Sequence, residues 1–191
     1  MKIFFYGGSF DPPHKGHLEI IKYCSSLCDK ILIIPANFSP LKQHLPYSKF
    51  SHRKNMLNIM LKNYRKNIEI SQYDSDQISP NYTYLTLRKI KSDYSNSTFT
   101  MILGSDQFNQ LYKWKNINEI LSSISLLIFN RNNINVNKVK IRVIDKYIKN
   151  FVIDCSSRKI RSLIGNKKTN IKCLDSNVYD YILSKKLYNV K

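Results

Sequence analysis

Short apolar runs alternate along the chain with longer segments of helical periodicity. The apolar runs are rich in Ile, Phe and Val and are bounded by polar or turn residues, which is typical of buried parallel strands. They cover residues 2–6, 30–35, 67–71, 98–104, 125–130 and 151–154. The segments with apolar residues at helical spacing cover residues 18–27, 49–64, 81–94 and 113–123. This alternation predicts an α/β fold, a Rossmann-like doubly wound and mostly parallel sheet with helices on both faces.

Two polar stretches and a final helix complete this outline. Residues 34–48 contain several prolines and follow a predicted strand, at the end of a parallel sheet where loops build binding sites. Residues 130–150 are Asn-rich and basic, and they predict a surface excursion before the last strand. Residues 174–188 predict a C-terminal helical region, an amphipathic helix capped by Asp175 or Ser176.

Length and composition are those of an ordinary globular protein. A chain of 191 residues with 42% hydrophobic residues fits a single domain over residues 1–191. No apolar window approaches the roughly 18 residues of a membrane span, and the apolar run at residues 2–6 is too short for a secretory signal. We therefore expect a cytoplasmic protein with no membrane partner. The four cysteines contain no Cys-x-x-Cys pair, so we expect reduced thiols and no metal bound by the protein.

The net charge of +18 is compatible with three interpretations. A strongly basic chain can bind nucleic acid, and it can also bind a small polyanion such as ATP. The third interpretation is compositional, because the chain is rich in Lys, Asn and Ile together and the extra lysines would then be solvated surface. The basic residues are scattered along the chain instead of forming an arm or a tail, which favours the last two interpretations over nucleic acid.

The stretch GGSFDPPHKGHL, Gly7 to Leu18, joins the first predicted strand to the first predicted helix. Gly7 and Gly8 end the strand, and glycine there permits positive φ and lets a ligand approach the backbone closely. The helix begins near His14, so its free N–H groups and its dipole form an anion site. Since His14 and His17 lie three residues apart, they share one face of that helix end, where each can donate a hydrogen bond to a phosphate.

Other interpretations of this stretch compete with phosphate binding. One histidine could cap the turn while the other packs against the sheet. A zinc site is not indicated, because no third ligand is evident at a suitable spacing. The stretch also differs from the Gly-x-Gly-x-x-Gly fingerprint, so a hydride-transfer enzyme is not indicated. The glycines, the prolines and the strand-to-helix turn together favour phosphate chemistry.

GGSFDPPHKGHL resembles the signature of the nucleotidyltransferase superfamily with the His-x-Gly-His motif. Within it, the chain resembles the bacterial-type nicotinate-mononucleotide adenylyltransferase family. NYTYLTL at residues 81–87 is similar to that family's Ser-Tyr-Thr segment, and ILGSDQFNQLYKW at residues 102–114 to its Gly-x-Asp segment with a downstream Trp. CSSRKIRSLI at residues 155–164 is similar to its second signature, Ser-Ser-Thr-x-x-Arg. These segments follow the family's order over nearly the whole chain.

The chain departs from the family pattern at three positions. Ser9 stands where Thr is commonest and keeps the hydroxyl group. Arg158 replaces the usual Thr of the second signature, so a contact from that hydroxyl is not carried over. Leu41 stands where Pro-His is usual, although the loop keeps Pro40 and Lys42.

The resemblance implies three groups of site residues. Contact with the reacting phosphates is implied for His14, His17 and Lys42. ATP binding is implied for Gly7, Gly8, Ser9, Phe10, His17, Gly104, Asp106, Ser156, Ser157 and Arg161. Mononucleotide binding is implied for Ser9, Phe10, Lys42, Tyr82, Thr83, Trp114 and Arg131. Apart from the resemblance, Trp114 is as readily a core residue, and Asp106, Ser156 and Ser157 are as readily helix caps.

The reaction that the resemblance implies is transfer of the adenylyl group of ATP to nicotinate mononucleotide, a step in NAD biosynthesis. The attacking phosphate oxygen is already ionised near neutral pH, so positioning and fixed positive charge would supply the catalysis without a general base. Mg²⁺ is the expected cofactor, held mainly by the ATP phosphates. ATP and nicotinate mononucleotide are the expected partners, and a homo-oligomer is left open.

Three alternatives remain at this point. A related adenylyltransferase could use nicotinamide mononucleotide as the acceptor, since backbone N–H groups can recognise a carboxylate and leave no mark in the sequence. Another related enzyme could use phosphopantetheine, although that acceptor gives no reason for the Tyr-Thr and Trp segments. From another class, a basic nucleic-acid-binding protein could use the same fold, but it would group basic and aromatic residues on one face.

Overall fold

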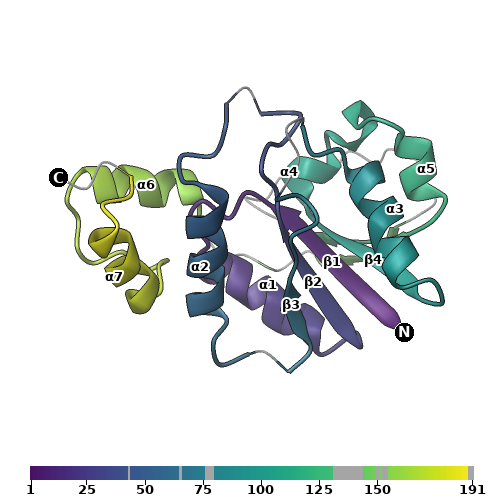
Figure 1. Ribbon diagram of the computed structural model, residues 1–191, viewed down its shortest axis with the longest axis horizontal. Coiled ribbons are helices and arrows are strands. Elements are labelled where there is room, and N and C mark those ends of the chain that lie inside the picture. The colour runs from purple at the N-terminus through teal and green to yellow at the C-terminus, as the bar shows by residue number, and fades with distance from the viewer. Residues whose placement is uncertain are drawn as a thin grey trace.

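A parallel sheet with the strand order β3-β2-β1-β4-β5-β6 forms the centre of the computed structural model (Figure 1). The structure describes residues 1–42, 44–64, 66–75, 80–130, 144–148, 151 and 155–188. Within these residues the strands are β1 (Lys2–Gly8), β2 (Lys30–Pro35), β3 (Ile68–Ile70), β4 (Thr98–Gly104), β5 (Ser125–Phe129) and β6 (Ile144–Ile148). This is the doubly wound order in which the chain reverses direction across the sheet between β1 and β4.

Helices connect the strands and cover both faces of the sheet, as the alternating pattern predicts. They are α1 (Lys15–Ser25), α2 (Phe50–Met60), α3 (Thr83–Asp93), α4 (Ser105–Phe108), the 3₁₀ turn η1 (Leu111–Lys113), α5 (Ile117–Leu121), α6 (Ser157–Gly165) and α7 (Ser176–Ser184). Figure 1 shows α6 and α7 beyond α2, at the end of the molecule opposite α3 and α5. The Asp175 side chain caps α7 by accepting hydrogen bonds from the N–H groups of residues 177 and 178, which confirms the predicted cap.

Side chains alternate along each strand, so the two faces of the sheet have separate apolar clusters. Phe4 and Tyr6 of β1 belong to the cluster that includes buried residues of α1, α2, α6 and α7. Ile3 and Phe5 belong to the cluster that includes buried residues of α3, α4 and α5. Burial on both faces explains why the central strands are continuous apolar runs instead of alternating ones, and it confirms the predicted fold class.

One strand lies where the sequence predicts none. β6 lies at residues 144–148, inside the stretch 130–150 that the polar pattern assigns to a surface excursion. Phe151 lies outside any strand, and residues 152–154 lie outside the described part of the chain. Among the strands that the structure describes, β6 pairs only with β5 and is the last strand of the sheet. An edge strand has a partner on one side alone, so it does not need the continuous apolar run that identifies the central strands.

The cysteines are only partly as predicted. Cys24 and Cys28 remain thiols, and burial raises the pKa of Cys24 far above its ordinary value. Cys155 and Cys173, in contrast, form a disulfide with 5.6 Å between their Cα atoms. The prediction of reduced thiols is wrong for this pair, because the fold brings together two residues whose distance of 18 positions along the chain gives no sign of contact.

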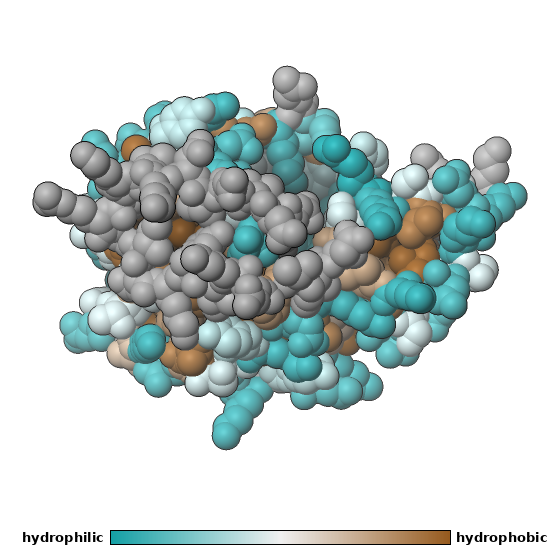
Figure 2. Space-filling model, turned by 180° about the vertical axis from the view of Figure 1, so that it is seen from behind, coloured by the Kyte–Doolittle hydropathy of each residue, from teal (hydrophilic) through white to brown (hydrophobic). Residues whose placement is uncertain are grey.

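The described surface is predominantly hydrophilic in the view from behind (Figure 2), in keeping with the net charge of +18. Among the helices that the structure describes, none has the length and apolar character needed to cross a bilayer. The prediction of a single domain over residues 1–191 stays a prediction.

Candidate nucleotide-binding site

The site forms where the sheet changes direction. β1 and β4 are neighbours, but the chain leaves β1 into α1 on one face and leaves β4 into α4 on the other. The crevice at the carboxyl ends of such strands is where doubly wound folds bind ligands. A pocket of about 640 Å³ opens there. The predicted site residues that line it are Gly7, Gly8, Ser9, Lys42, Tyr82, Thr83, Asp106 and Trp114.

The turn after β1 uses its glycines differently from the prediction. None of the described glycines has positive φ; the left-handed residue is Phe10, at φ 48°. A Cβ on Gly8 would lie 3.2 to 3.5 Å from the Phe10 ring, so glycine is needed there for close packing of that ring. A Cβ on Gly7 would meet no atom within 4 Å. Since Gly7 lines the pocket, that open space is room for a ligand against the backbone.

The two histidines lie side by side at the start of α1, as predicted, but both are buried. His14 is the N-cap residue and is 2% exposed, and His17 is 6% exposed. Their rings are stacked with 3.7 Å between centroids, and the His17 ring also packs against the Phe10 ring at 4.9 Å. The backbone N–H of His14 donates to Nδ1 of His17 at 3.2 Å. In neutral His17 the proton is therefore on Nε2, which makes that nitrogen the donor.

A second helix N-terminus meets this turn, as the second signature predicts. The Ser157 hydroxyl, in the first residue of α6, donates to the Pro12 carbonyl at 2.9 Å. Nη1 of Arg161 donates to the Asp11 carbonyl, and its guanidinium lies 4.1 Å from the Tyr47 ring centroid. Both predicted ATP ligands thus contact the GGSFDPPHKGHL turn directly. Two helices that direct their N-termini to one turn form an environment suited to an anion.

Ser156 and Arg158 flank Ser157 at this helix end. Ser156 is the exposed N-cap residue, and Arg158 is exposed and lines the pocket. The N-terminal end of a helix already carries partial positive charge, so a positive side chain in the first turn is unfavourable there on its own. An anion bound nearby would be attracted by both the side chain and the helix dipole. The disulfide fixes the start of α6 further, because Cys155 precedes the N-cap and the Cys173 carbonyl accepts from the N–H of Lys15 in α1.

Lys42 reaches the turn from the loop between β2 and α2. Its Nζ donates to the Ser9 hydroxyl at 2.7 Å. The residue is exposed in overall area, yet desolvation of the ammonium and the nearby positive charge of Arg161 lower its pKa. A cation held close to other cations at a pocket wall is stabilised when a polyanion arrives.

A buried arginine that the sequence reasoning missed holds this loop against the turn. Arg53 in α2 is fully buried, and Nη1 donates to the carbonyls of Ser9 at 2.7 Å and Ala36 at 2.8 Å. Nε donates to the Ser48 carbonyl at 3.1 Å. Burial lowers the pKa of Arg53, and Asp11 opposes that effect. Arg53 therefore joins both ends of the Lys42 loop to the turn.

Asp11 completes this connection from inside the turn. Its buried carboxylate accepts from the Tyr47 N–H at 2.6 Å, from the Ser48 hydroxyl at 2.6 Å and from the Tyr188 hydroxyl at 2.7 Å. The turn, the Lys42 loop and the C-terminal segment are thus connected through one side chain. Only the position of Asp11 between Phe10 and two prolines marks it in the sequence, and its partners lie far along the chain.

The far end of the pocket is aromatic. Tyr82 is the N-cap residue of α3, Thr83 is the first residue of that helix, and Trp114 follows η1. Trp114 is half-buried, packs against the cluster under α3 and α5, and lines the pocket. It is therefore neither a fully buried core residue nor a free surface residue. Nζ of Lys115, which also lines the pocket, lies 4.8 Å from the Tyr82 ring centroid.

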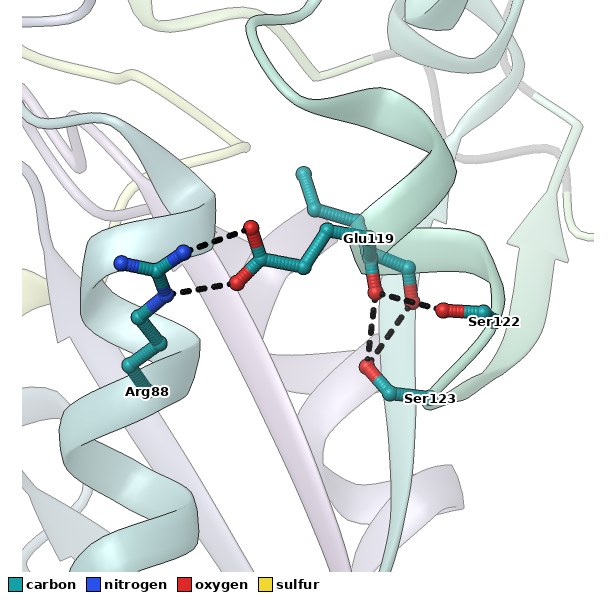
Figure 3. A network of polar contacts seen from close by, with 5 residues as sticks. Arg88, Glu119, Ser122 and Ser123 are labelled. Carbon is teal, nitrogen blue, oxygen red and sulfur yellow. Dashed lines mark hydrogen bonds and ion pairs between the residues drawn. The ribbon is translucent and has the colours of Figure 1, made fainter.

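An ion pair connects α3, which begins after Tyr82, to α5, which follows Trp114 on the chain (Figure 3). Arg88 in α3 donates from Nε and Nη2 to the two carboxylate oxygens of Glu119 in α5, at 2.6 and 2.9 Å. The hydroxyl groups of Ser122 and Ser123 donate to the Glu119 carbonyl at 3.1 and 3.0 Å. The pair is exposed, so its free energy is small, but its two parallel hydrogen bonds restrict how α3 and α5 can move relative to each other.

Acidic groups are few around the pocket. Asp106 is exposed in the first turn of α4, and Gly104 before it ends β4 and is buried. Asp74 lines the pocket but is buried, accepts from the Thr86 hydroxyl at 2.7 Å and has a pKa raised by burial. Among the described residues no group of three or more His, Cys, Asp or Glu side chains could hold a metal ion. The predicted Arg131 lies outside the described residues.

Comparison with known proteins decides the family. Residues 5–163 match the family model described as cytidylyltransferase-like. A probable nicotinate-nucleotide adenylyltransferase of Leptospira interrogans is 31% identical and covers 96% of this chain and 95% of its own length. One from Staphylococcus epidermidis is 32% identical over 100% of this chain and 98% of its own length. The chain belongs to the nicotinate-nucleotide adenylyltransferase family. This result confirms the resemblance in the sequence.

Solved structures of nicotinate-nucleotide adenylyltransferases support the same fold. The nicotinic acid mononucleotide adenylyltransferase of Plasmodium falciparum, complexed with APC, has a TM-score of 0.81 at 24% identity and covers 100% of this chain and 98% of its own. The same enzyme complexed with NaAD has a TM-score of 0.80. At 24% identity this likeness concerns the fold alone, and the shared fold covers 100% of this chain.

Proposed function

We infer that the chain transfers the adenylyl group of ATP to nicotinate mononucleotide, giving nicotinate adenine dinucleotide and pyrophosphate in NAD biosynthesis. One observation carries this conclusion: the pocket at the β1/β4 switch point is lined by Lys42 and by residues of the GGSFDPPHKGHL turn, where two helix N-termini meet, in a chain of this family. The turn provides backbone donors for phosphates, and the basic residues that line the pocket outnumber the acidic ones: Lys42, Lys113, Lys115 and Arg158 against Asp74 and Asp106.

The chemistry requires two polyanions to meet. The 5′-phosphate oxygen of the mononucleotide attacks the α-phosphorus of ATP, the bond between the α-phosphorus and the bridging oxygen breaks, and pyrophosphate leaves. No proton is transferred from the nucleophile, because the attacking oxygen is ionised at neutral pH. Lys42, the α1 N-terminus and the two histidines at that helix end would offset the charge that grows on the reacting phosphates.

Each substrate has its own set of residues in this proposal. The triphosphate lies at the start of α6, where Ser157 and Arg161 exchange their present contacts with the Pro12 and Asp11 carbonyls for phosphate oxygens. Asp106 holds the ATP ribose beside the end of β4. The remaining ATP residues are Gly7, Gly8, Ser9, Phe10, Gly104 and Ser156. The mononucleotide occupies the aromatic end of the pocket, formed by Tyr82, Thr83 and Trp114, and Arg131 stays a prediction.

Magnesium enters as part of the substrate. The described pocket has few carboxylates, and the Asp74 carboxylate is engaged by Thr86. A donor set of this kind fits Mg²⁺ that is held by the ATP phosphates and its own water molecules. The ion then supplies charge neutralisation on the triphosphate, while the side chains of the protein position the two substrates.

The test is pyrophosphate release from MgATP with nicotinate mononucleotide, nicotinamide mononucleotide or phosphopantetheine as the acceptor. We expect release with the acid mononucleotide and a higher kcat/KM for it than for the amide, because a site of hydrogen-bond donors leaves the amide NH₂ group unpaired. Equal or reversed preference would contradict the substrate assignment. Release with phosphopantetheine alone would assign the chain to the related enzyme class.

A further inference from the structure

Lys115 brings a full positive charge to the aromatic end of the pocket. Its Nζ lies over the Tyr82 ring, 4.8 Å from the centroid, and the residue lines the same pocket as Trp114. The neighbouring lysine on the chain, Lys113, has its Nζ 5.6 Å from the centroid of Tyr112, which is 69% exposed. Both lysines line the pocket, but only Tyr82, the partner ring of Lys115, lines it as well, so Lys115 is the one whose ammonium group lies over a ring of the pocket wall.

The backbone after Lys115 limits where this side chain can go. Asn116 has φ 54° and ψ 39°, the left-handed conformation, so the chain turns sharply between Lys115 and α5. The Arg88–Glu119 pair then joins α5 to α3, the helix that begins directly after Tyr82 (Figure 3). Tyr82 thus lies at the start of α3, and Lys115 lies just before α5. The Arg88–Glu119 pair holds these two helices together near the same ends, which keeps the Lys115 ammonium near the Tyr82 ring.

The charge of Lys115 distinguishes between the flat rings that could occupy this end. Adenine is neutral, and nicotinamide is neutral at its amide group, so neither gains much from a nearby ammonium. Nicotinate carries a carboxylate on the same pyridine ring. A hydrogen bond between an ammonium and a carboxylate is about twice as strong as one between neutral groups. The ring that best complements Tyr82, Trp114 and Lys115 together is therefore an aromatic carboxylate.

We propose that Lys115 binds the nicotinate carboxylate and sets the preference of the enzyme for the acid over the amide mononucleotide. The proposal rests on the proposed function, since it requires that the mononucleotide ring lies between Tyr82 and Trp114. It assigns specificity to a side chain, in addition to any backbone N–H groups at this end. It also assigns Lys115 no part in the reaction at the phosphates, which the proposed function assigns to the GGSFDPPHKGHL turn.

Steady-state kinetics of Lys115→Met with both mononucleotides at saturating MgATP test this directly. We expect kcat/KM for nicotinate mononucleotide to fall about tenfold, the loss of one charge-assisted hydrogen bond at the pocket rim. The amide substrate has the same ring, ribose and phosphate, so its kcat/KM should stay within about twofold if the variant is folded. Lys115→Arg should keep most of the preference, because it keeps the charge. Calorimetric titration of each mononucleotide without ATP should give the same order of affinities.

Lys113→Met is the matched control, since it removes one positive charge from the lining of the same pocket, two residues earlier on the chain. A loss of acid preference in Lys113→Met as large as that in Lys115→Met would mean a general electrostatic effect and would overturn the proposal. An unchanged ratio of acid to amide in Lys115→Met, with an active parent enzyme, would overturn the proposal and leave the proposed function standing. A parent enzyme that binds neither mononucleotide would overturn both.

Discussion

Replacing the buried Arg53 by methionine tests whether the Lys42 loop is held to the phosphate turn by this side chain. The fully buried guanidinium donates hydrogen bonds to the carbonyls of Ser9, Ala36 and Ser48. Removing one partner of a buried charged network costs about 3–5 kcal/mol, because the groups left behind are buried without partners. For a domain of this size about 1 kcal/mol corresponds to 2–4 °C in Tm, so we expect Tm to fall by roughly 6–20 °C.

Urea unfolding, followed by circular dichroism and by the fluorescence of Trp114, gives the free energy of unfolding of each variant. Arg53→Lys keeps the positive charge but cannot reach all three carbonyls, so it should fall between the parent and Arg53→Met. Lys54→Met, on the same helix at a position of intermediate exposure, is the control and should stay within about 0.5 kcal/mol. Since Ser9 and Lys42 are both positioned by Arg53, kcat of folded Arg53→Lys should also fall, by about tenfold.

This role of Arg53 would be refuted by an Arg53→Met variant whose free energy of unfolding lies within about 1 kcal/mol of the parent. It would also be refuted if Arg53→Lys and the parent had the same kcat, because the loop and the turn would then be positioned without the three hydrogen bonds.

Three further predictions concern the site. His14→Ala and His17→Ala should each lower kcat at least roughly a hundredfold, about 2.7 kcal/mol; near-parent kcat at saturating substrates would exclude a role at the phosphates. Nicotinate mononucleotide without ATP should quench Trp114 fluorescence, and Trp114→Ala should raise KM for the mononucleotide with KM for ATP nearly unchanged; a variant that melts early but keeps its mononucleotide KM would make Trp114 a core residue. Because burial raises the pKa of Asp74, the protonated carboxyl group favours the folded state. This contribution to stability is fully present below the unfolded-state pKa and is lost as pH rises through the folded-state pKa. Asp74→Asn should therefore have a higher Tm than the parent near about pH 8 and an equal one below about pH 4, and a lower Tm near about pH 8 would contradict this account.

The sequence predicts the local and periodic features of this protein well. The apolar runs of the central strands, the cap Asp175 and the start of α1 at His14 depend on short-range patterns, and the structure confirms them. The loops that follow the predicted parallel strands indicate where a binding site forms, and the pocket beside Gly7 lies at these loops.

Features that depend on tertiary contact could not be predicted in this way. The role of Arg53 rests on three carbonyls from separate loops, and a carbonyl has no sequence signature. The Cys155–Cys173 disulfide depends on how α6 is placed against α1. The left-handed residue of the turn is Phe10 instead of a glycine, since the packing of its ring over Gly8 outweighs the backbone preference.

Isotope tracing tests the central claim, adenylyl transfer from ATP to nicotinate mononucleotide, most directly. The enzyme is incubated with unlabelled MgATP and nicotinate mononucleotide whose phosphate carries oxygen-18 at every non-bridging position, and the products are separated and weighed by mass spectrometry. Attack by the mononucleotide phosphate on the α-phosphorus predicts that all of the label stays in nicotinate adenine dinucleotide and that the pyrophosphate is unlabelled. Label in the pyrophosphate or in inorganic phosphate, or the absence of the dinucleotide, would contradict the account.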